Sequence, residues 1–373
     1  MEKVIIWGAS QNGLRLKREL EQHGWGEIYC FCDNNENKIG SKLDNVDIMS
    51  FDDIINMCHN VFNGSIVISI NEPESVVEQI RNSGIKIKVY ITSYEWKNRL
   101  NKKLDSINKI LLEIDIDKPQ LEYYEYHIAY HCNLKCKGCG HYSNIADPEF
   151  GDLDQYKKDI LRLKELYWGV KRIRLMGGEP LLNVHLPEFC IATREVFPDA
   201  NIRVVTNGLL IPSIADEVLR VMSRYYIGFD ITQYLPTKEI KEKIELKCIE
   251  GNVEFSLSLP VEKFYFHENI GHKSDRTLNY EKCISRKCHF LENGKISICS
   301  EPILQNKFKN KIDRDWKVSE SDIMDLYKED LDGFALNDFL SHPIPWCEHC
   351  DYNTITWFEW EGNYPFLMEK QKS

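Results

Sequence analysis

Short apolar runs alternate with amphipathic stretches through the first quarter of the chain. The pattern predicts strands at 4–7, 28–32, 66–70 and 85–91, with helices ending near Gln22 and covering 74–82. A strand–helix–strand rhythm of this kind is typical of a parallel sheet with helices on its faces. We therefore predict an α/β domain over residues 1–93. The charged pattern that follows, up to Pro119, favours a helical connector over 94–121.

The same rhythm starts again after the connector. Strands are predicted at 126–130, 170–176, 202–205, 226–231 and 253–259. The helices between them are predicted at 153–166, 186–197, 214–225 and 237–249. Such βα units are consistent with a partial barrel, in which functional residues gather at the carboxyl ends of the strands. Three distinctive loops follow the first three strands: a cysteine loop, a Gly-Gly-Glu-Pro turn and a Thr-Asn-Gly turn. We place this domain at 122–265.

Composition excludes several classes of protein. The chain has 373 residues, enough for two or three domains, and is 43% hydrophobic and 28% charged, as a globular protein is. Its net charge of -11 argues against a nucleic-acid groove binder, which needs a clustered basic surface. No apolar run approaches the roughly 18–20 residues that span a bilayer. The N-terminal apolar stretch resembles a first strand more than a signal peptide, so we expect a reducing, cytoplasmic setting with free thiols.

The thirteen cysteines are unevenly distributed. Three fall within residues 132–139, and five more follow residue 280 at positions 283, 288, 299, 347 and 350. The remaining five stand singly in strand-like or helical stretches, where a buried thiol behaves as a small apolar side chain. We interpret these as core residues: Cys30, Cys32, Cys58, Cys190 and Cys248.

The tight cysteine loop is the first candidate metal site. Cys132, Cys136 and Cys139 place three thiolates just after a predicted strand. Cysteine thiolate is the usual protein ligand of iron–sulfur clusters, and three ligands for four irons leave one iron open for chemistry. The alternative is a structural zinc site, with His131 or His141 as the fourth ligand.

This part of the chain resembles the radical S-adenosylmethionine (SAM) superfamily. The loop matches the family signature Cys-x3-Cys-x2-Cys, Met176-Gly-Gly-Glu-Pro180 matches its GGEP motif, and Thr206-Asn-Gly208 matches a frequent ending of its third strand. The family usually carries an aromatic residue immediately before the third cysteine, whereas this chain has Gly138.

The resemblance implies a fold, cofactors and a chemistry. The fold would be a partial (βα)6 TIM-like barrel. A catalytic [4Fe-4S] cluster would be bound by the three cysteines, and its open iron would be chelated by SAM. An electron from a flavodoxin- or ferredoxin-type donor would then cleave SAM to a 5′-deoxyadenosyl radical. The cofactor-binding residues that the motifs imply are Gly177, Gly178, Glu179, Pro180, Thr206 and Asn207.

The C-terminal cysteines form a second candidate site over residues 266–373. Asn293-Gly294 between two apolar runs predicts a hairpin. From the spacing alone, a zinc ribbon is one interpretation. The segment also resembles the twitch and SPASM extensions of radical SAM enzymes, because Cys283, Gly294 and Cys299 fit their spacing. That resemblance implies one auxiliary [4Fe-4S] cluster. Its ligands would include Cys299, Cys347 and Cys350, with Cys283 and Cys288 competing for the fourth position.

The N-terminal segment has a degraded dinucleotide-binding pattern. Gly8 and Gly13 flank a predicted strand-to-helix turn, Asp33 closes the next strand, and Ser10 replaces the middle glycine. The segment resembles the small Rossmann-like domain of bacterial polysaccharide and sugar-nucleotide enzymes. Two roles stay open for it: nucleotide binding, or docking of a partner or carrier.

The resemblance to sugar- and aminocyclitol-modifying members suggests a carbohydrate or sugar-nucleotide substrate that undergoes oxidation, epimerisation or dehydration. Candidate residues at the later strand ends are Tyr234 and Asp230 for catalysis and Ser258 for the cofactor, with Gln233, Ser256 and His141 as further polar candidates. One alternative is a peptide-modifying enzyme. Another, of a different class, is a non-catalytic iron–sulfur sensor or scaffold.

Overall fold

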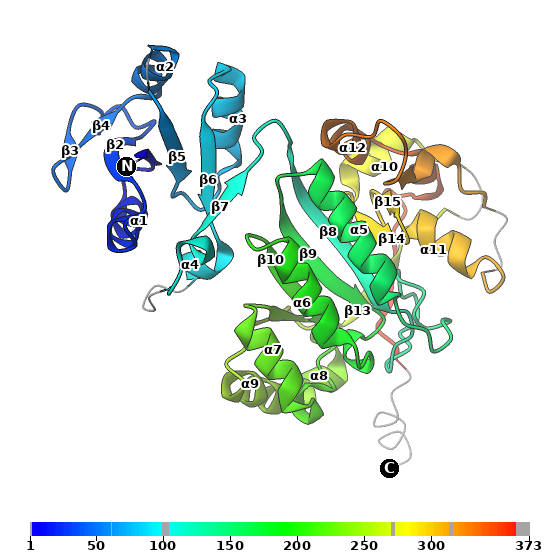
Figure 1. Cartoon of the computed structure of the whole chain (residues 1–373). Coiled ribbons are helices and arrows are strands. Elements are labelled where there is room, and N and C mark those ends of the chain that lie inside the picture. The colour runs from blue at the N-terminus through cyan, green and yellow to red at the C-terminus, as the bar shows by residue number, and fades with distance from the viewer. Residues whose placement is uncertain (1, 61, 99–103, 270–272, 313–315, 363–373) are drawn as a thin grey trace. The chain divides into compact units, whose positions relative to one another are not determined.

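The computed structural model describes residues 2–60, 62–98, 104–269, 273–312 and 316–362. The chain divides at Gln120 into two compact units (Figure 1). Among the described residues, no helix is both long enough and apolar enough to cross a membrane.

The N-terminal unit is built on a seven-stranded sheet. Its strand order is β3-β4-β2-β1-β5-β6-β7. The strands are β1 (Lys3–Trp7), β2 (Glu27–Cys32), β3 (Lys42–Leu43), β4 (Val46–Met49), β5 (Gly64–Ile68), β6 (Lys88–Thr92) and β7 (Leu111–Ile114). The helices are α1 (Gln11–Gln22), α2 (Phe51–Asn60), α3 (Glu74–Ser83) and α4 (Tyr94–Asn98). In this order, the five neighbouring strands β4, β2, β1, β5 and β6 run parallel, as the βα rhythm predicted.

The expected helical connector over 94–121 differs in the structure. Its first residues form the helix α4, but its later residues form the strand β7. This strand pairs antiparallel with β6 and so completes the N-terminal sheet. The segment is largely apolar: Leu111 and Ile114 are buried, and the one charged residue, Glu113, is exposed and lies opposite Tyr90 of β6, whose hydroxyl donates to it at 3.1 Å.

The C-terminal unit contains the predicted parallel series. The strands are β8 (Gln120–Ala129), β9 (Gly169–Gly177), β10 (Asn201–Thr206), β11 (Gly228–Ile231) and β12 (Phe255–Leu257). The helices that follow them are α5 (Leu153–Leu166), α6 (Leu186–Val196), α7 (Asp216–Arg224), α8 (Leu235–Glu239) and α9 (Lys241–Glu250). The strands lie side by side in chain order, and the arrangement is consistent with the predicted partial TIM-like barrel.

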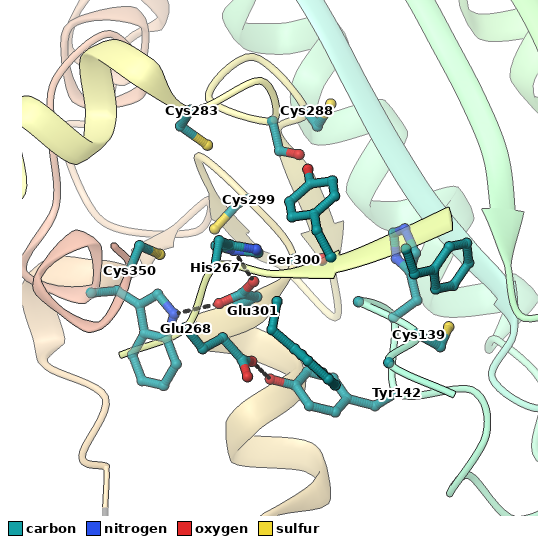
Figure 2. Close-up of a pocket in the computed structure, with 18 of the residues that line it drawn as sticks. Cys139, Tyr142, His267, Glu268, Cys283, Cys288, Cys299, Ser300, Glu301 and Cys350 are labelled. Atoms are coloured by element: carbon teal, nitrogen blue, oxygen red, sulfur yellow. Dashed lines mark hydrogen bonds and ion pairs between the residues drawn. The ribbon is translucent and has the colours of Figure 1, made fainter. Parts of the chain in front are cut away.

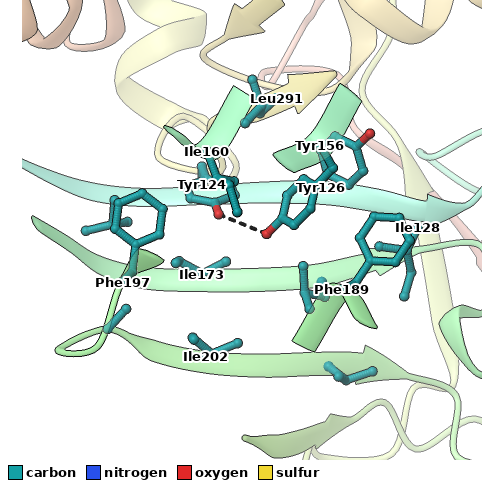
Figure 3. Close-up of a cluster of buried hydrophobic side chains, with 14 of the residues drawn as sticks. Tyr124, Tyr126, Ile128, Tyr156, Ile160, Ile173, Phe189, Phe197, Ile202 and Leu291 are labelled. Atoms are coloured by element: carbon teal, nitrogen blue, oxygen red, sulfur yellow. Dashed lines mark hydrogen bonds between the residues drawn. The ribbon is translucent and has the colours of Figure 1, made fainter. Parts of the chain in front are cut away.

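The core of this unit lies between the sheet and its helices. Tyr126, Tyr156 and Phe189 are fully buried there, with ring centres 4.5 to 6.1 Å apart. Hydroxyl groups buried in the same core satisfy one another: Tyr156 bonds to Tyr124 at 3.1 Å and to Thr193 at 2.6 Å (Figure 3). Cys190 and Cys248 also lie in this core, as predicted.

The C-terminal segment extends the same sheet. Strand β14 (Phe290–Glu292) pairs parallel with β8, and β15 (Lys295–Ser297) and β16 (Met324–Asp325) continue outward. The predicted hairpin is confirmed, with both Asn293 and Gly294 in the left-handed region at φ 48° and 74°. The remaining helices are α10 (Arg276–Lys282), α11 (Glu301–Phe308) and α12 (Gly333–Leu340).

A separate two-stranded sheet joins the two parts of this unit. Strand β13 (Lys263–Phe266) pairs antiparallel with β17 (Thr356–Glu359), near the end of the described chain. The expected domain boundary between residues 265 and 266 therefore falls inside a strand.

Phe189→Ala tests the core. We expect it to lower the free energy of unfolding by about 3–5 kcal/mol, because a buried aromatic ring is replaced by a cavity. Urea unfolding followed by tryptophan fluorescence measures this loss. The matched control is Leu246→Ala on α9, where the side chain is 57% exposed and the change should stay within about 0.5 kcal/mol. Equal losses in the two variants would contradict the packing described.

Candidate metal and cofactor site

The cysteine loop follows the carboxyl end of β8. Leu134 is fully buried and anchors the loop against Leu209 and Trp360. Burial raises the pKa of the Cys132 thiol to about 12, and the neighbouring Glu179, Cys136 and Cys139 add to this rise. The loop therefore gathers its three thiols in one partly buried place.

Three N–H groups point at the sulfur atoms of this loop. The Leu134 backbone donates to Cys132 Sγ at 3.4 Å, and Asn207 Nδ2 lies 3.7 Å from the same sulfur. The indole Nε1–H of Trp360 donates to Cys136 Sγ at 3.2 Å. Such donors stabilise negatively charged thiolate ligands, so the residues present fit a bound cluster.

The alternative zinc site is poorly supported by the loop geometry. A tetrahedral zinc ion with bonds of about 2.3 Å needs sulfurs roughly 3.8 Å apart. In the described part of the chain, the metal-ligand group with all atoms within 4.8 Å is a different one: His267, Glu301 and Cys350. His141 is instead paired with His127 at 2.9 Å, and His131 Nδ1 lies 3.2 Å from the Glu149 carbonyl oxygen.

The GGEP turn lies directly against the cysteine loop. Gly178 N–H donates to the Ala129 carbonyl at 2.8 Å, and Glu179 N–H donates to the His131 carbonyl at 3.0 Å. A side chain on Gly178 would place its Cβ 2.1 Å from the His131 oxygen, and one on Gly177 would lie 2.0 Å from the Ala129 oxygen. Only glycine permits this approach.

The carboxylate of Glu179 joins the GGEP turn to the Thr-Asn-Gly turn. It is fully buried and accepts hydrogen bonds from Thr206 Oγ1 at 2.7 Å and from the backbone N–H groups of Asn207 and Leu181, each at 3.0 Å. Burial raises its pKa to about 7, although these three hydrogen bonds lower the pKa in part. Pro180 is buried and begins the short 3-10 turn Pro180–Leu182. The contact of Glu179 with the SAM amine stays a prediction.

The structure separates the other candidate residues. Tyr234 stacks on Trp360, with ring centres 5.4 Å apart, and packs beside the cysteine loop. Asp230 pairs with Arg174 at 2.9 Å and accepts from Ser256. Ser258 Oγ accepts the backbone N–H of Gln233 at 3.0 Å. Of the three candidates, Tyr234 lies at the cysteine loop, and the other two have partners within the strand ends.

The second group of cysteines lines a cavity of about 660 Å³, which Cys139 of the first loop also reaches. Figure 2 shows the sulfur atoms of Cys283, Cys299 and Cys350 directed into one space. Burial raises the pKa of Cys350 well above its ordinary value, and the neighbouring Glu301, Cys299, Cys347 and Cys283 contribute. Together with Cys347, these cysteines therefore line one cavity.

Cys288 has different surroundings. Burial raises its pKa to about 12, and the carboxylate of Glu125 on β8 and the thiol of Cys283 add to this rise. In Figure 2 its sulfur points away from Cys299. This direction favours Cys283 over Cys288 as a ligand, and the choice between the two stays a prediction.

Several residues at the two sites carry no sequence signal of their own. His267 Nε2 lies 3.1 Å from Glu301 Oε1, and Glu301 Oε2 accepts the Trp346 indole N–H at 3.0 Å, inside the same cavity. Glu301 follows Cys299 by two residues, which is the one hint the sequence offers. Nothing in the sequence pattern connects Trp360 with Cys136.

Family comparisons agree with this geometry. Residues 126–253 match the model of the radical SAM superfamily. This segment is a radical SAM domain. Its cofactors are those of the family, a [4Fe-4S] cluster and SAM, as the sequence predicted. Residues 1–91 match a second model, described as C2185-like, N-terminal.

Individual relatives are more distant. A GTP 3′,8-cyclase from Campylobacter jejuni subsp. doylei is 23% identical over 267 residues, which cover 64% of this chain and 78% of the relative. A GTP 3′,8-cyclase from Pelotomaculum thermopropionicum is 34% identical over 109 residues, or 27% of this chain and 31% of the relative. Among solved structures, BtrN in an open conformation aligns over 66% of this chain and 97% of its own, with 18% identity and a TM-score of 0.37.

Gly178→Ala tests the contact between the GGEP turn and the cysteine loop. We expect loss of most of the iron bound at the loop, because the added methyl group would displace the His131 carbonyl. Iron analysis after anaerobic reconstitution measures this loss. The matched control is Gly140→Ala in the same loop, where a Cβ would meet nothing within 4 Å and iron content should be unchanged. Full iron content in Gly178→Ala would contradict the constraint.

Proposed function

We propose that this protein is a radical SAM enzyme that abstracts hydrogen from a carbohydrate or sugar-nucleotide substrate. The observation that carries the proposal is the shared cavity. Cys139 of the radical SAM loop and the cysteines of the C-terminal segment line the same space. A small molecule bound there would lie between a site that generates a radical and a second cysteine site.

The catalytic cluster, when bound, supplies the electron that cleaves SAM to methionine and a 5′-deoxyadenosyl radical. Cys132, Cys136 and Cys139 would hold this cluster. The glycine backbone of the GGEP turn lies beside it and leaves room for the methionyl part of SAM. A flavodoxin- or ferredoxin-type protein would provide the electron.

Four cysteines that line the cavity would hold an auxiliary [4Fe-4S] cluster: Cys283, Cys299, Cys347 and Cys350. A cluster at this place could accept an electron from the substrate radical, which favours oxidation over the other two outcomes. Asn279 supports the pair near the C-terminus, since its Nδ2 donates to the Cys347 carbonyl at 3.0 Å.

The lining of the cavity supports a polar ligand with a ring. Aromatic faces suited to packing against sugar rings come from residues such as Tyr265 and Trp357. Lys263 and Arg286 add positive charge suited to a phosphate group. The sequence relatives are named for a reaction of GTP, which also supports a nucleotide-containing substrate.

Cys136→Ala tests the radical chemistry. Reduced, reconstituted wild-type protein incubated anaerobically with SAM should release 5′-deoxyadenosine, and the variant should release none because the catalytic cluster loses a ligand. Chromatography of the quenched reaction measures the release. Cys58→Ala, at a partly exposed cysteine outside both sites, should behave as the wild type.

A panel of nucleotide sugars and GTP then identifies the substrate class, since the substrate should increase the release of 5′-deoxyadenosine. A wild-type protein that carries iron but releases no deoxyadenosine would refute the proposed activity.

The auxiliary cluster predicts an iron count. Wild-type protein should contain about eight iron atoms per chain, four for each [4Fe-4S] cluster. Cys283→Ala should lose the auxiliary cluster or leave it oxygen-labile, whereas Cys288→Ala should retain about eight irons because its thiol is directed elsewhere. Iron analysis combined with Mössbauer spectroscopy distinguishes the two variants. The reverse ranking would contradict the assignment of the four ligands.

A further inference from the structure

The end of the described chain lies across the cysteine loop. We define residues 356–362 as the strap. Within the strap, the Glu361 carbonyl accepts the backbone N–H of Lys137 at 2.9 Å, and the Glu361 carboxylate pairs with Lys137 Nζ at 3.3 Å. The backbone of Trp360 is itself held, because its N–H donates to the Glu262 carbonyl at 2.8 Å. The strap is thus held by the cysteine loop through Glu361 and by the residue before β13 through the backbone of Trp360.

Gly138 makes room for the strap. A Cβ at this position would lie 2.6 Å from Cζ of Phe358, and the backbone has φ +70°. Phe358 in turn stacks on Phe266 of β13, with ring centres 4.7 Å apart and planes inclined by 25°. The aromatic residue that the family usually carries before the third cysteine would collide with these rings. Gly138 is therefore part of the surface on which the strap packs.

The strap delivers one polar group to a cysteine sulfur. Trp360 is 6% exposed, and its indole Nε1–H donates to Cys136 Sγ at 3.2 Å. Tyr234 stacks on the indole ring, with ring centres 5.4 Å apart and planes inclined by 25°, and so restricts its orientation. A buried indole N–H normally finds a hydrogen-bond partner, and here that partner is a cluster ligand.

We propose that Trp360 sets the reduction potential of the catalytic cluster through its hydrogen bond to Cys136. This inference rests on the proposed function, because it assumes a [4Fe-4S] cluster at the loop. One-electron reduction adds a negative charge to a cluster, and part of this charge resides on the cysteine sulfurs. An N–H donor stabilises that charge and raises the potential. Trp360 acts on the cluster through Cys136 and makes reduction by the electron donor easier.

Trp360→Phe removes the N–H group and keeps the ring. We expect the potential of the catalytic cluster to move to more negative values, with iron content unchanged. A redox titration followed by electron paramagnetic resonance measures this shift, using the signal that is missing in Cys136→Ala. The control is Trp357→Phe in the same strap, where the side chain is 58% exposed and the potential should stay at the wild-type value. An unshifted potential in Trp360→Phe, or an equal shift in the control, would overturn the proposal.

A measurement on the unaltered chain covers the case in which the variant fails to bind iron. Tryptophan labelled with 15N at the indole nitrogen should give a weak 15N coupling to the reduced catalytic cluster in pulsed electron paramagnetic resonance. The coupling should persist in Trp357→Phe. Its absence in the wild type would overturn the proposal. Neither experiment requires SAM cleavage, so failure of the proposed activity would show separately, as a normal cluster that releases no deoxyadenosine.

Discussion

The carboxylate of Glu179 is the contact on which the organisation of the candidate site depends. It comes from the turn after β9 and accepts two hydrogen bonds from the turn after β10. The turn after β9 is in turn bonded through its backbone to the cysteine loop after β8. Three consecutive strand ends are thereby held together. Because the carboxylate is buried, losing one of its donors would leave a polar group unsatisfied, which costs about 1–3 kcal/mol.

The glycines of the site have the same structural role. Gly177 and Gly178 allow the GGEP turn to contact the backbone that leads into the cysteine loop, and Gly138 allows the strap to pack on that loop. In each case the missing side chain is what permits a second segment to approach. The site is therefore assembled from backbone contacts first, and its polar side chains are positioned by them.

The C-terminal segment shares sheets with the rest of the C-terminal unit. Strand β14 pairs with β8, and β13 pairs with β17, so segments far apart in the chain share the same sheets. This pairing brings the later cysteines to a cavity that Cys139 also lines.

Local patterns were sufficient for much of the fold. The apolar periodicity located the five parallel strands and α5, whose predicted bounds agree with the structure, and Asn293-Gly294 located a hairpin. The edge strand β7 falls in the predicted helical connector because its four residues, Leu-Leu-Glu-Ile, are too few to show a strand pattern within a charged stretch. Strands β13 and β17 were not predicted, because their pairing joins positions about a hundred residues apart and a local sequence pattern does not reveal such a pairing.

The sequence by itself determined the spacing of the first cysteine group and the motifs around it, which identify a radical SAM domain. Spacing within one loop is a local property, so Cys132, Cys136 and Cys139 could be recognised without a structure. The tertiary structure alone showed that the thiols of Cys283 and Cys288 point in different directions, because the direction of a side chain depends on how the surrounding segments pack. It alone placed Trp360 on Cys136, because a hydrogen bond between residues 224 positions apart depends on how distant strands pair.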